Sequence, residues 1–448
     1  MVTDTREASR RVAINSIIPF TATMAGRILS WGMAVVMART LGPEGTGAYA
    51  FAVNLWLYAS IISDFGLGTW LTREIARSPE RASDAVRLSL GLRLALSTAA
   101  GLTLVLVVLT YAALGIGDVD REIVATAALL AVGLLPGAFS AAGTALFNAH
   151  QRMVFPATIQ LGSAALTTVL GAAALLNGFG IVALGWVSLT VNVVTAAIFM
   201  TASVRQYVPL DISLWPRRQL KLARETLPLM LNGLLNNVFF RIDIQVLQSQ
   251  GSAIVGNYAN AYKVIDAAGA VPSSFVLALF PVLSRRAAAD DGKEALYRVY
   301  VLALKLLLIA ALVIAIPVTV YAWEVTRLSW GPEFLPHSAV ALQILVWFLP
   351  LSFFNGLTQY VLIALGLQAR ITPAFALAAA FNVAANLLLV PRFSYVAAGW
   401  ITIATEIVLL VPFLMALRGH VGLRRLLRDL LHFDARERAL LLSLLRRA

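Results

Sequence analysis

Cysteine is absent from the 448-residue chain, and histidine occurs only four times. Without cysteine the chain can form neither a disulfide nor a thiolate metal site. The histidines are His150, His337, His420 and His432, and none stands at the spacing of paired metal ligands. The sequence therefore predicts no bound metal.

Charged residues are also scarce, because they make up 13% of the chain while hydrophobic residues make up 59%. Soluble domains carry about 25% charged residues. The mean hydropathy of +0.81 is spread over many separate apolar runs of about 20 residues, a length that crosses a bilayer. These features exclude a soluble protein. The first run is longer than the apolar core of a signal peptide, so we expect it to remain as a membrane helix.

Signatures of catalysis are missing as well. No lysine follows the glycine spacing of a phosphate-binding loop, and the patterns HExxH and GxSxG do not occur. A membrane glycosyltransferase or polymerase would carry acidic residues on a sizeable outer loop, whereas the outer loops here are short. We therefore expect that the protein is not an enzyme and binds no cofactor. If its activity is coupled to an ion, we expect that ion to be H+ or Na+.

The apolar runs predict an all-α polytopic membrane protein with twelve spanning helices. Their expected ranges are 12–38, 48–70, 85–114, 121–149, 155–176, 180–204, 222–247, 254–284, 295–322, 336–365, 371–390 and 395–418. The net charge is +12, and most lysines and arginines lie in alternate loops. The other loops hold Arg39, Arg121, Arg327 and Arg392. The positive-inside rule therefore places both termini in the cytoplasm and explains the charge without a nucleic-acid partner.

An internal repeat is visible at an offset of 209 residues. The positions Pro19, Gly42, Gly47, Tyr49, Ala50 and Ala52 recur as Pro228, Gly251, Gly256, Tyr258, Ala259 and Ala261. A weaker echo matches Leu135, Pro136 and Phe139 with Leu349, Pro350 and Phe353. Six helices separate the copies, so both halves enter the bilayer in the same orientation, as parallel repeats. Two six-helix lobes with a cleft between them are expected.

The repeat suggests a division of the chain into four parts. We predict a first lobe over 1–205, a cytoplasmic linker over 206–221, a second lobe over 222–418 and a basic tail over 419–448. The leucines of the tail recur at helical spacing with arginines between them. This pattern is typical of an amphipathic helix that lies on the anionic inner leaflet.

Ionisable residues inside the predicted helices are the candidates for function. Each costs about 2.5 to 3.5 kcal/mol at a lipid-facing helix centre, so such residues normally face a cavity or a partner. The cations of interest are Arg27, Arg241 and Lys263, and the acids are Asp243, Asp266 and Glu406. Arg27 continues a polar stripe with Pro19 and Thr23 on the first helix. We expect this stripe to line the cleft.

Several polar residues have a simpler structural interpretation. Lys263 can pair with Asp266, three residues further along the helix. Asp64, Arg93 and Lys305 lie near cytoplasmic helix ends, where an intramembrane ion pair or a side chain that reaches the headgroups would only fix packing. The polar rows Ser140, Thr144, Asn148 and Asn382, Asn386 are more often contacts between helices than ligands.

Three stretches of the sequence are distinctive: ARTLGPEGTGAYAFA, DFGLGTWLTREIAR and RIDIQVLQSQGSAIVGNYANAYKVID. In these stretches the chain resembles the polysaccharide or O-antigen flippases of the multidrug/oligosaccharidyl-lipid/polysaccharide exporter superfamily. The resemblance implies a V of two lobes in the inner membrane that opens to either side in turn and moves undecaprenyl-pyrophosphate-linked oligosaccharide. It assigns pyrophosphate contact to Arg27 and Arg241, with Lys263 as a further candidate. Membrane lipids and polysaccharide assembly proteins are the other partners that it implies.

Two alternatives to a flippase remain at this stage. A multidrug or cation antiporter of the same superfamily would use carboxylates and aromatic walls, and would not depend on the arginines. A membrane scaffold for a polysaccharide assembly complex would depend on no cleft residue. For a flippase, we expect Asp243, Asp266 or Glu406 to titrate or to bind Na+ and so drive the cycle.

Overall fold

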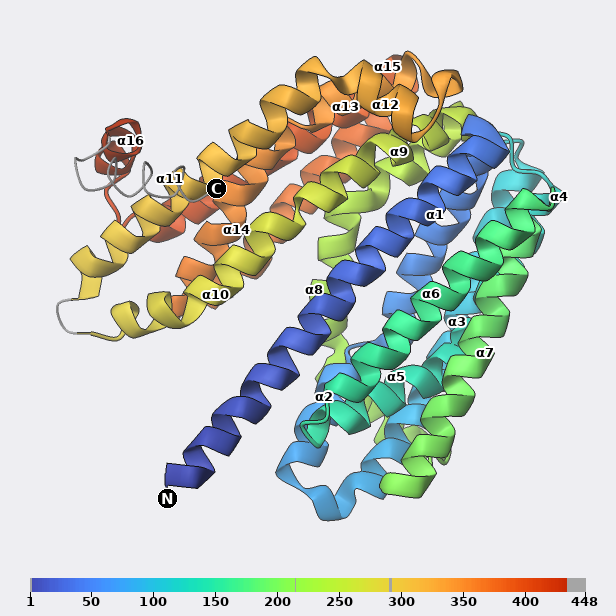
Figure 1. Ribbon diagram of the computed structural model, residues 1–448, viewed down its shortest axis with the longest axis horizontal. Helices are drawn as coiled ribbons and strands as arrows, with labels where there is room; N and C mark the ends of the chain where they lie inside the picture. Colours follow the sequence, from blue (N-terminus) through green and yellow to red (C-terminus); the bar gives the residue numbers. More distant parts are fainter. Residues whose placement is uncertain (1, 214, 290–291, 433–448) are drawn as a thin grey trace. The chain divides into compact units, whose positions relative to one another are not determined.

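The computed structural model describes residues 2–213, 215–289 and 292–432, and its elements within these ranges are helices (Figure 1). The predicted all-α class is confirmed. Contacts divide the chain into two compact units, which we call the first and second units. The first holds Met1–Asn237, Ile244–Ala259 and Ser329–Phe334; the second holds Val238–Asp243, Asn260–Leu328 and Leu335–Ala448. Most of the helix expected at 222–247 thus belongs to the first unit, and the predicted lobe boundaries stay predictions.

Helix α1 (Val2–Asp64) contains the first predicted span and most of the second. A straight helix of 63 residues would be about 95 Å long, three times the thickness of the hydrocarbon layer. The chain instead reverses at Gly42, whose φ of 65° is open to glycine at no steric cost. Figure 1 shows the two blue arms of α1 on either side of this turn. Each arm is long enough to cross the membrane once.

Helix α15 (Ile371–Leu417) likewise contains a reversal, at Ser394 with φ 54°. In the described part of the chain, eight helical stretches are long and apolar enough to span a membrane, and two of them hold these reversals. Two further crossings are α8 (Pro216–Leu247) and the pair α9 (Ser252–Ala268) and α10 (Ala270–Ala287). The helices therefore agree with the predicted twelve crossings, and the protein is a multi-pass membrane protein.

The internal repeat is reproduced in the backbone. Gly251, the counterpart of Gly42, also has a positive φ, of 102°. The weaker echo coincides with a pair of helix breaks. Helix α4 (Arg121–Val132) gives way to α5, which begins at Leu134, and α13 (His337–Leu345) gives way to α14, which begins at Phe348. Each new helix carries its repeated proline, Pro136 or Pro350, in the first turn, where proline is tolerated.

Two equivalent glycines of the repeat pack directly against each other within the first unit. A Cβ atom on Gly47 would lie 1.7 Å from the Ser252 carbonyl oxygen, and one on Gly256 would lie 2.0 Å from the Pro43 carbonyl oxygen. Real side chains do not approach this closely, so only glycine permits the contact. The second arm of α1 and the start of α9 thus meet backbone to backbone.

The rest of the first unit is a bundle around an aliphatic core. It contains α2 (Leu67–Arg77), α3 (Ala82–Ala113), α5 (Leu134–Ala149), α6 (Val154–Leu176) and α7 (Ile181–Gln206). Leu71, Leu90 and Leu146 are fully buried where α2, α3 and α5 meet. This packing fixes the opposite faces of α2 and α5, which carry the site described below.

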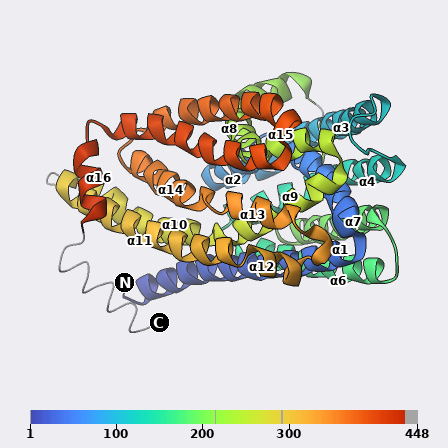
Figure 2. The same cartoon turned by 90° about the horizontal axis from the view of Figure 1, so that it is seen from above.

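In the second unit, α11 (Gly292–Val320), α14 (Phe348–Ala364) and α15 pack together, and α12 (Ala322–Ser329) follows α11. Helix α16 (Leu423–Leu431) lies across the end of α11 (Figure 2). Its Leu426 is buried, while Leu427 is exposed. Residues 433–448 of the predicted tail lie outside the described residues, and its place on the inner leaflet stays a prediction.

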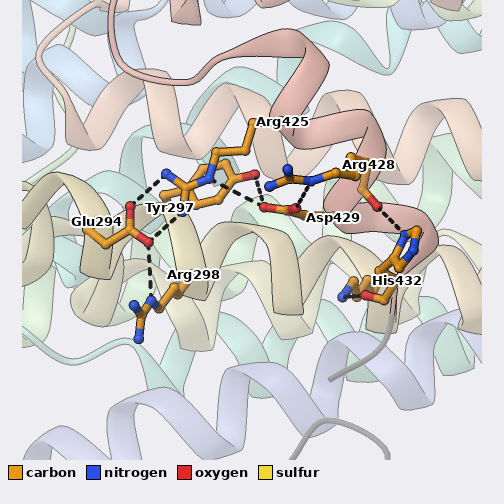
Figure 3. Close-up of polar contacts among 8 residues, drawn as sticks. Glu294, Tyr297, Arg298, Arg425, Arg428, Asp429 and His432 are labelled. Atoms are coloured by element: carbon orange, nitrogen blue, oxygen red, sulfur yellow. Dashed lines mark hydrogen bonds and ion pairs between the residues drawn. The ribbon is translucent and has the colours of Figure 1, made fainter. Parts of the chain in front are cut away.

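Polar contacts hold α16 on α11 (Figure 3). Arg425 forms an ion pair with Glu294 at 2.6 Å, and the Tyr297 hydroxyl donates to Asp429 at 2.7 Å. Lys305 is 4% exposed and donates to the backbone oxygen of His432 at 2.6 Å. The structural interpretation of Lys305 agrees with this contact, although its ammonium group binds a carbonyl at the end of α16 and not the lipid headgroups.

Candidate functional site

A cavity of about 940 Å³ lies within the first unit. Its volume is in the range of sites for small molecules, about 300 to 1,000 Å³. The walls come from the end of α1 and from α2, α5, α6 and α7. The polar lining residues are Asp64, Thr69, Thr72, Arg73, Ser140, Thr144, Asn148, Gln160, Ser163, Thr167, Ser188, Asn192 and Thr195.

Helical periodicity brings these side chains to one side of each helix. On α5 the polar row is Ser140, Thr144, Asn148, with a spacing of four residues. On α6 it is Gln160, Ser163, Thr167, and on α7 it is Ser188, Asn192, Thr195. Spacings of three and four place residues on a single face. Three consecutive helices therefore present hydroxyl and amide groups to the same space.

Some of these groups are paired and others are open. Ser163 and Thr195 share a hydrogen bond of 2.7 Å, and Thr72 donates to the Gly68 carbonyl at 2.9 Å. Within the described ranges, by contrast, no hydrogen bond engages the side chain of Thr144, Asn148 or Gln160. Their interpretation as contacts between helices is wrong for Thr144 and Asn148, because these side chains face the cavity.

An ion pair stands in the cavity wall. Arg93, on α3, is 1% exposed, and its Nη1 lies 2.7 Å from Asp64 Oδ1. Of the two structural interpretations of Arg93, the structure agrees with the intramembrane ion pair and not with a side chain that reaches the headgroups, since Arg93 is enclosed by the bundle. Its Nε and Nη2 atoms are buried without a hydrogen-bond partner in the described structure. The carboxylate of Asp64 is 45% exposed and lines the cavity.

A second cavity, of about 380 Å³, adjoins the first. The two share Thr144, Asn148, Gln160 and Ala164 in their walls. On its other side the second cavity is lined by Pro19 and Thr23, which belong to the predicted polar stripe of the first helix. Arg27, in the same stripe, is exposed and lines neither cavity.

The other predicted residues lie in the second unit. Asp266 does not pair with Lys263 within the described residues but with Arg241, whose Nη2 is 2.8 Å from Asp266 Oδ2. The Arg241 guanidinium also lies 5.1 Å from the centre of the Tyr262 ring. Lys263 is half-buried, and Asp243 is 3% exposed. Two of the predicted site residues, Arg241 and Asp266, are therefore brought together.

Glu406 lies in a separate buried network of the second unit. The Asn355 Nδ2 donates to Glu406 Oε2 at 2.5 Å and to the Glu406 backbone oxygen at 2.8 Å. Nearby on α15, Asn382 donates to Thr405 at 2.9 Å, and Asn386 donates to Asn382 at 3.0 Å. For Asn382, the interpretation as a contact between helices is confirmed.

Sequence reasoning missed the cavity residues on α2, α6 and α7. Arg73 lines the larger cavity and forms no ion pair within the described chain. The signal that could have found the site is the recurrence of polar rows on three successive helices. No group of three or more potential metal ligands occurs among the described residues. The cavity offers hydrogen bonds, one cation and one paired carboxylate.

Comparison with known proteins gives a family and a fold. A family model described as "Polysaccharide biosynthesis protein" matches residues 12–287. A search of curated proteins found no match. The lipid II flippase MurJ in an inward closed conformation gives a TM-score of 0.73 at 14% identity, covering 93% of this chain and 89% of that chain. An inward-facing multidrug resistance MATE family transporter of the MOP superfamily gives 0.69 at 20%, covering 91% and 99%.

A third solved structure is similar over nearly the same length. It is a MOP superfamily transporter from Pyrococcus furiosus, with a TM-score of 0.59 at 17% identity, covering 91% of this chain and 95% of that chain. At these identities the likeness shows the fold alone. That fold is the multi-span helical fold shared by these transporters.

Proposed function

Because this chain belongs to the polysaccharide biosynthesis protein family, we propose that it is a flippase for undecaprenyl-pyrophosphate-linked oligosaccharide in the cytoplasmic membrane. It would work by alternating access, with both termini in the cytoplasm. The observation that carries the proposal is the polar cavity among membrane-spanning helices. Its hydroxyl, amide and charged groups are costly in hydrocarbon unless they serve a polar cargo.

The cargo has three chemically distinct parts, and each needs a different environment. The polyprenyl tail is apolar and can stay in lipid. The pyrophosphate cannot enter hydrocarbon unpaired without a large desolvation cost. The sugar is dense in hydroxyl groups that require hydrogen-bond partners. A flippase therefore has to supply cations and hydrogen bonds at membrane depth.

For the pyrophosphate we propose Arg27, Arg241 and Lys263 as contacts, together with Arg73. A guanidinium offers two parallel hydrogen bonds to a phosphate, which an ammonium does not. Arg73 is supported by its place in the lining of the larger cavity. Arg241 already pairs with Asp266, so a phosphate would have to displace that carboxylate. This exchange would couple cargo binding to a change at Asp266.

Energy for the cycle would come from H+ or Na+. We propose Asp243, Asp266 and Glu406 as the coupling acids. Asp243 and Glu406 are buried, and Asp266 is released when its arginine turns to another anion. Amide substitution at all three positions should abolish the dependence of transport on ion gradients. Unchanged, gradient-driven transport in the triple amide variant would contradict this part of the proposal.

The decisive test is translocation in reconstituted vesicles. A fluorescent undecaprenyl-pyrophosphate oligosaccharide is placed in the inner leaflet, and its arrival in the outer leaflet is followed by quenching with an impermeant reagent. We expect the wild-type protein to accelerate transfer, and Arg73→Ala and Arg241→Ala to reduce it at equal protein levels. Arg39→Ala, in a predicted outer loop, is the matched control.

Other outcomes would favour the alternatives. Transport of cationic drugs that survives both arginine substitutions would indicate a multidrug antiporter. If the vesicles translocate no lipid-linked sugar, while polysaccharide assembly in cells still requires the protein but not its cavity residues, a scaffold role replaces the flippase.

A further inference from the structure

The geometry points to a saccharide subsite within the first unit, formed by Thr144, Asn148 and Gln160. We propose that this wall binds uncharged sugar residues of the cargo through direct hydrogen bonds. The inference rests on the proposed function, and it adds which part of the cargo this cavity takes. It does not depend on the arginines proposed for the pyrophosphate.

The position of the three side chains is the first argument. They stand in the wall common to the cavities of about 940 and 380 Å³, so groups on both sides are within their reach. Thr144 and Asn148 extend from the last turns of α5, and Gln160 extends from the second turn of α6. These helix ends flank residues 150–153, a loop that the charge pattern places in the cytoplasm. A sugar would therefore enter from the side on which it is made.

Hydrogen-bonding capacity is the second argument. Within the described structure none of the three side chains is engaged by another protein group. A threonine hydroxyl and a carboxamide each both donate and accept hydrogen bonds. A sugar hydroxyl also does both, so each of these side chains can either donate a hydrogen bond to it or accept one from it. Groups at this depth would otherwise pair with each other or with the helix backbone, as Ser163 and Thr195 do.

Charge is the third argument. Among the described lining residues, Asp64 and Arg73 are the charged ones, and Asp64 is held by the buried Arg93. An anion would bind at Arg73, on the α2 side of the cavity. Facing it, α5, α6 and α7 contribute no charge to the lining. That side suits an uncharged hydroxyl-rich group rather than a second phosphate.

The lining also disfavours an aromatic or cationic drug. Phe199 is the aromatic residue in the described lining of the larger cavity. Sites for such ligands are walled mainly by apolar and aromatic side chains, with few polar groups. Here nine of the fifteen described lining residues on α5, α6 and α7 carry a hydroxyl or an amide. The chemistry of the wall therefore favours carbohydrate.

The experiment measures binding of two probes to the full chain in nanodiscs. One is undecaprenyl pyrophosphate carrying a neutral tetrasaccharide, and the other is undecaprenyl pyrophosphate without sugar. Thr144→Val, Asn148→Leu and Gln160→Met remove the polar groups but keep nearly the same shape. Thr98→Val and Thr103→Val on the exposed side of α3 are matched controls, because these hydroxyls bond only to their own helix.

We expect each cavity variant to weaken binding of the sugar-bearing probe by about three- to tenfold, the worth of one hydrogen bond. Binding of the sugar-free probe should stay the same, and the controls should bind both probes as the wild type does. Equal weakening of both probes, or no weakening of either, overturns the subsite while leaving the flippase in place. If the wild type binds neither probe and translocates none, the proposed function fails and the subsite fails with it.

Discussion

Two polar rows with the same spacing behave differently in the two units. Thr144 and Asn148 on α5 are four residues apart, as are Asn382 and Asn386 on α15. In the second unit Asn386 donates to Asn382, and Asn382 donates to Thr405, so both amide groups are engaged within the protein. In the first unit Thr144 and Asn148 face an open cavity. The residue types and spacings do not tell these cases apart.

The difference comes from the opposing surface. The two arms of α15 pack closely, so Asn382 finds a hydroxyl at hydrogen-bond distance. The faces of α6 and α7 that line the cavity with α5 are themselves polar, and the space enclosed is about 940 Å³. Membrane proteins place polar groups either in saturated contacts or along a path for polar cargo. Asn382 illustrates the first case, and Thr144 and Asn148, which line the cavity, are proposed to illustrate the second.

The largest effect on stability is expected at the ion pair between Asp64 and Arg93 in the cavity wall. Asp64→Leu leaves the buried Arg93 without its partner, and we expect the free energy of unfolding to fall by about 3 to 5 kcal/mol. Adding Arg93→Met should restore much of the loss, because no charge then remains buried. Denaturant unfolding in detergent micelles measures both. Arg87→Met, which removes an exposed ion pair with Asp211, should cost less than about 1 kcal/mol.

A double variant that is no more stable than Asp64→Leu alone would show that the cavity wall is held by something other than this pair.

A sharper form of the comparison substitutes one asparagine from each row. Asn382→Leu removes the contact with Thr405 and should lower the free energy of unfolding by about 0.5 to 2 kcal/mol, the range found for hydrogen bonds between membrane helices. Asn148→Leu removes no bond within the described protein and should change it by less than about 0.5 kcal/mol. The same unfolding measurement compares them. Equal losses would mean that both rows are structural.

The smallest effect is expected at the water-exposed contact between α11 and α16. The hydrogen bond from Tyr297 lowers the pKa of Asp429 below its usual 3.8, with further lowering from Arg428 and Arg425. A lowered pKa in the folded state means that the contact stabilises docking above pH 3.8. This stability is lost as the pH falls through the lowered value. Helix α16 should therefore stay docked near neutral pH and loosen only in acid.

Because the chain has no cysteine, one cysteine can be introduced on α11 and one on α16 and labelled specifically. The distance between the two labels is then measured as a function of pH. In Tyr297→Phe the loosening should begin at a higher pH than in the wild type. An identical pH profile would show that this hydrogen bond does not hold α16.

Much of the fold followed from the sequence, because each apolar run must span a layer of fixed thickness. The repeat was predictive in detail, since Gly42 and Gly251 both adopt positive φ and the two prolines both lie in the first turn of a new helix. The expected range 121–149 begins and ends where α4 begins and α5 ends. The expected range 371–390 begins with α15 and ends a few residues before the reversal at Ser394.

The site was less accessible to sequence reasoning. Asp64 and Arg93 are 29 residues apart, and nothing local indicates that α1 and α3 bring them together. Asp266 was expected to pair with Lys263, three residues away on the same helix, but it pairs with Arg241. Which partner wins depends on the faces that helices turn to each other, and spacing along a single helix does not encode that.

The contact between Gly47 and Gly256 bears on how such a chain could arise. These residues occupy the same position in two copies of one repeat, so each copy offers the other an identical, self-complementary patch. In a single six-helix polypeptide with that patch, the glycine would let two copies approach backbone to backbone. Joining two such polypeptides end to end would preserve this approach and free each half to diverge.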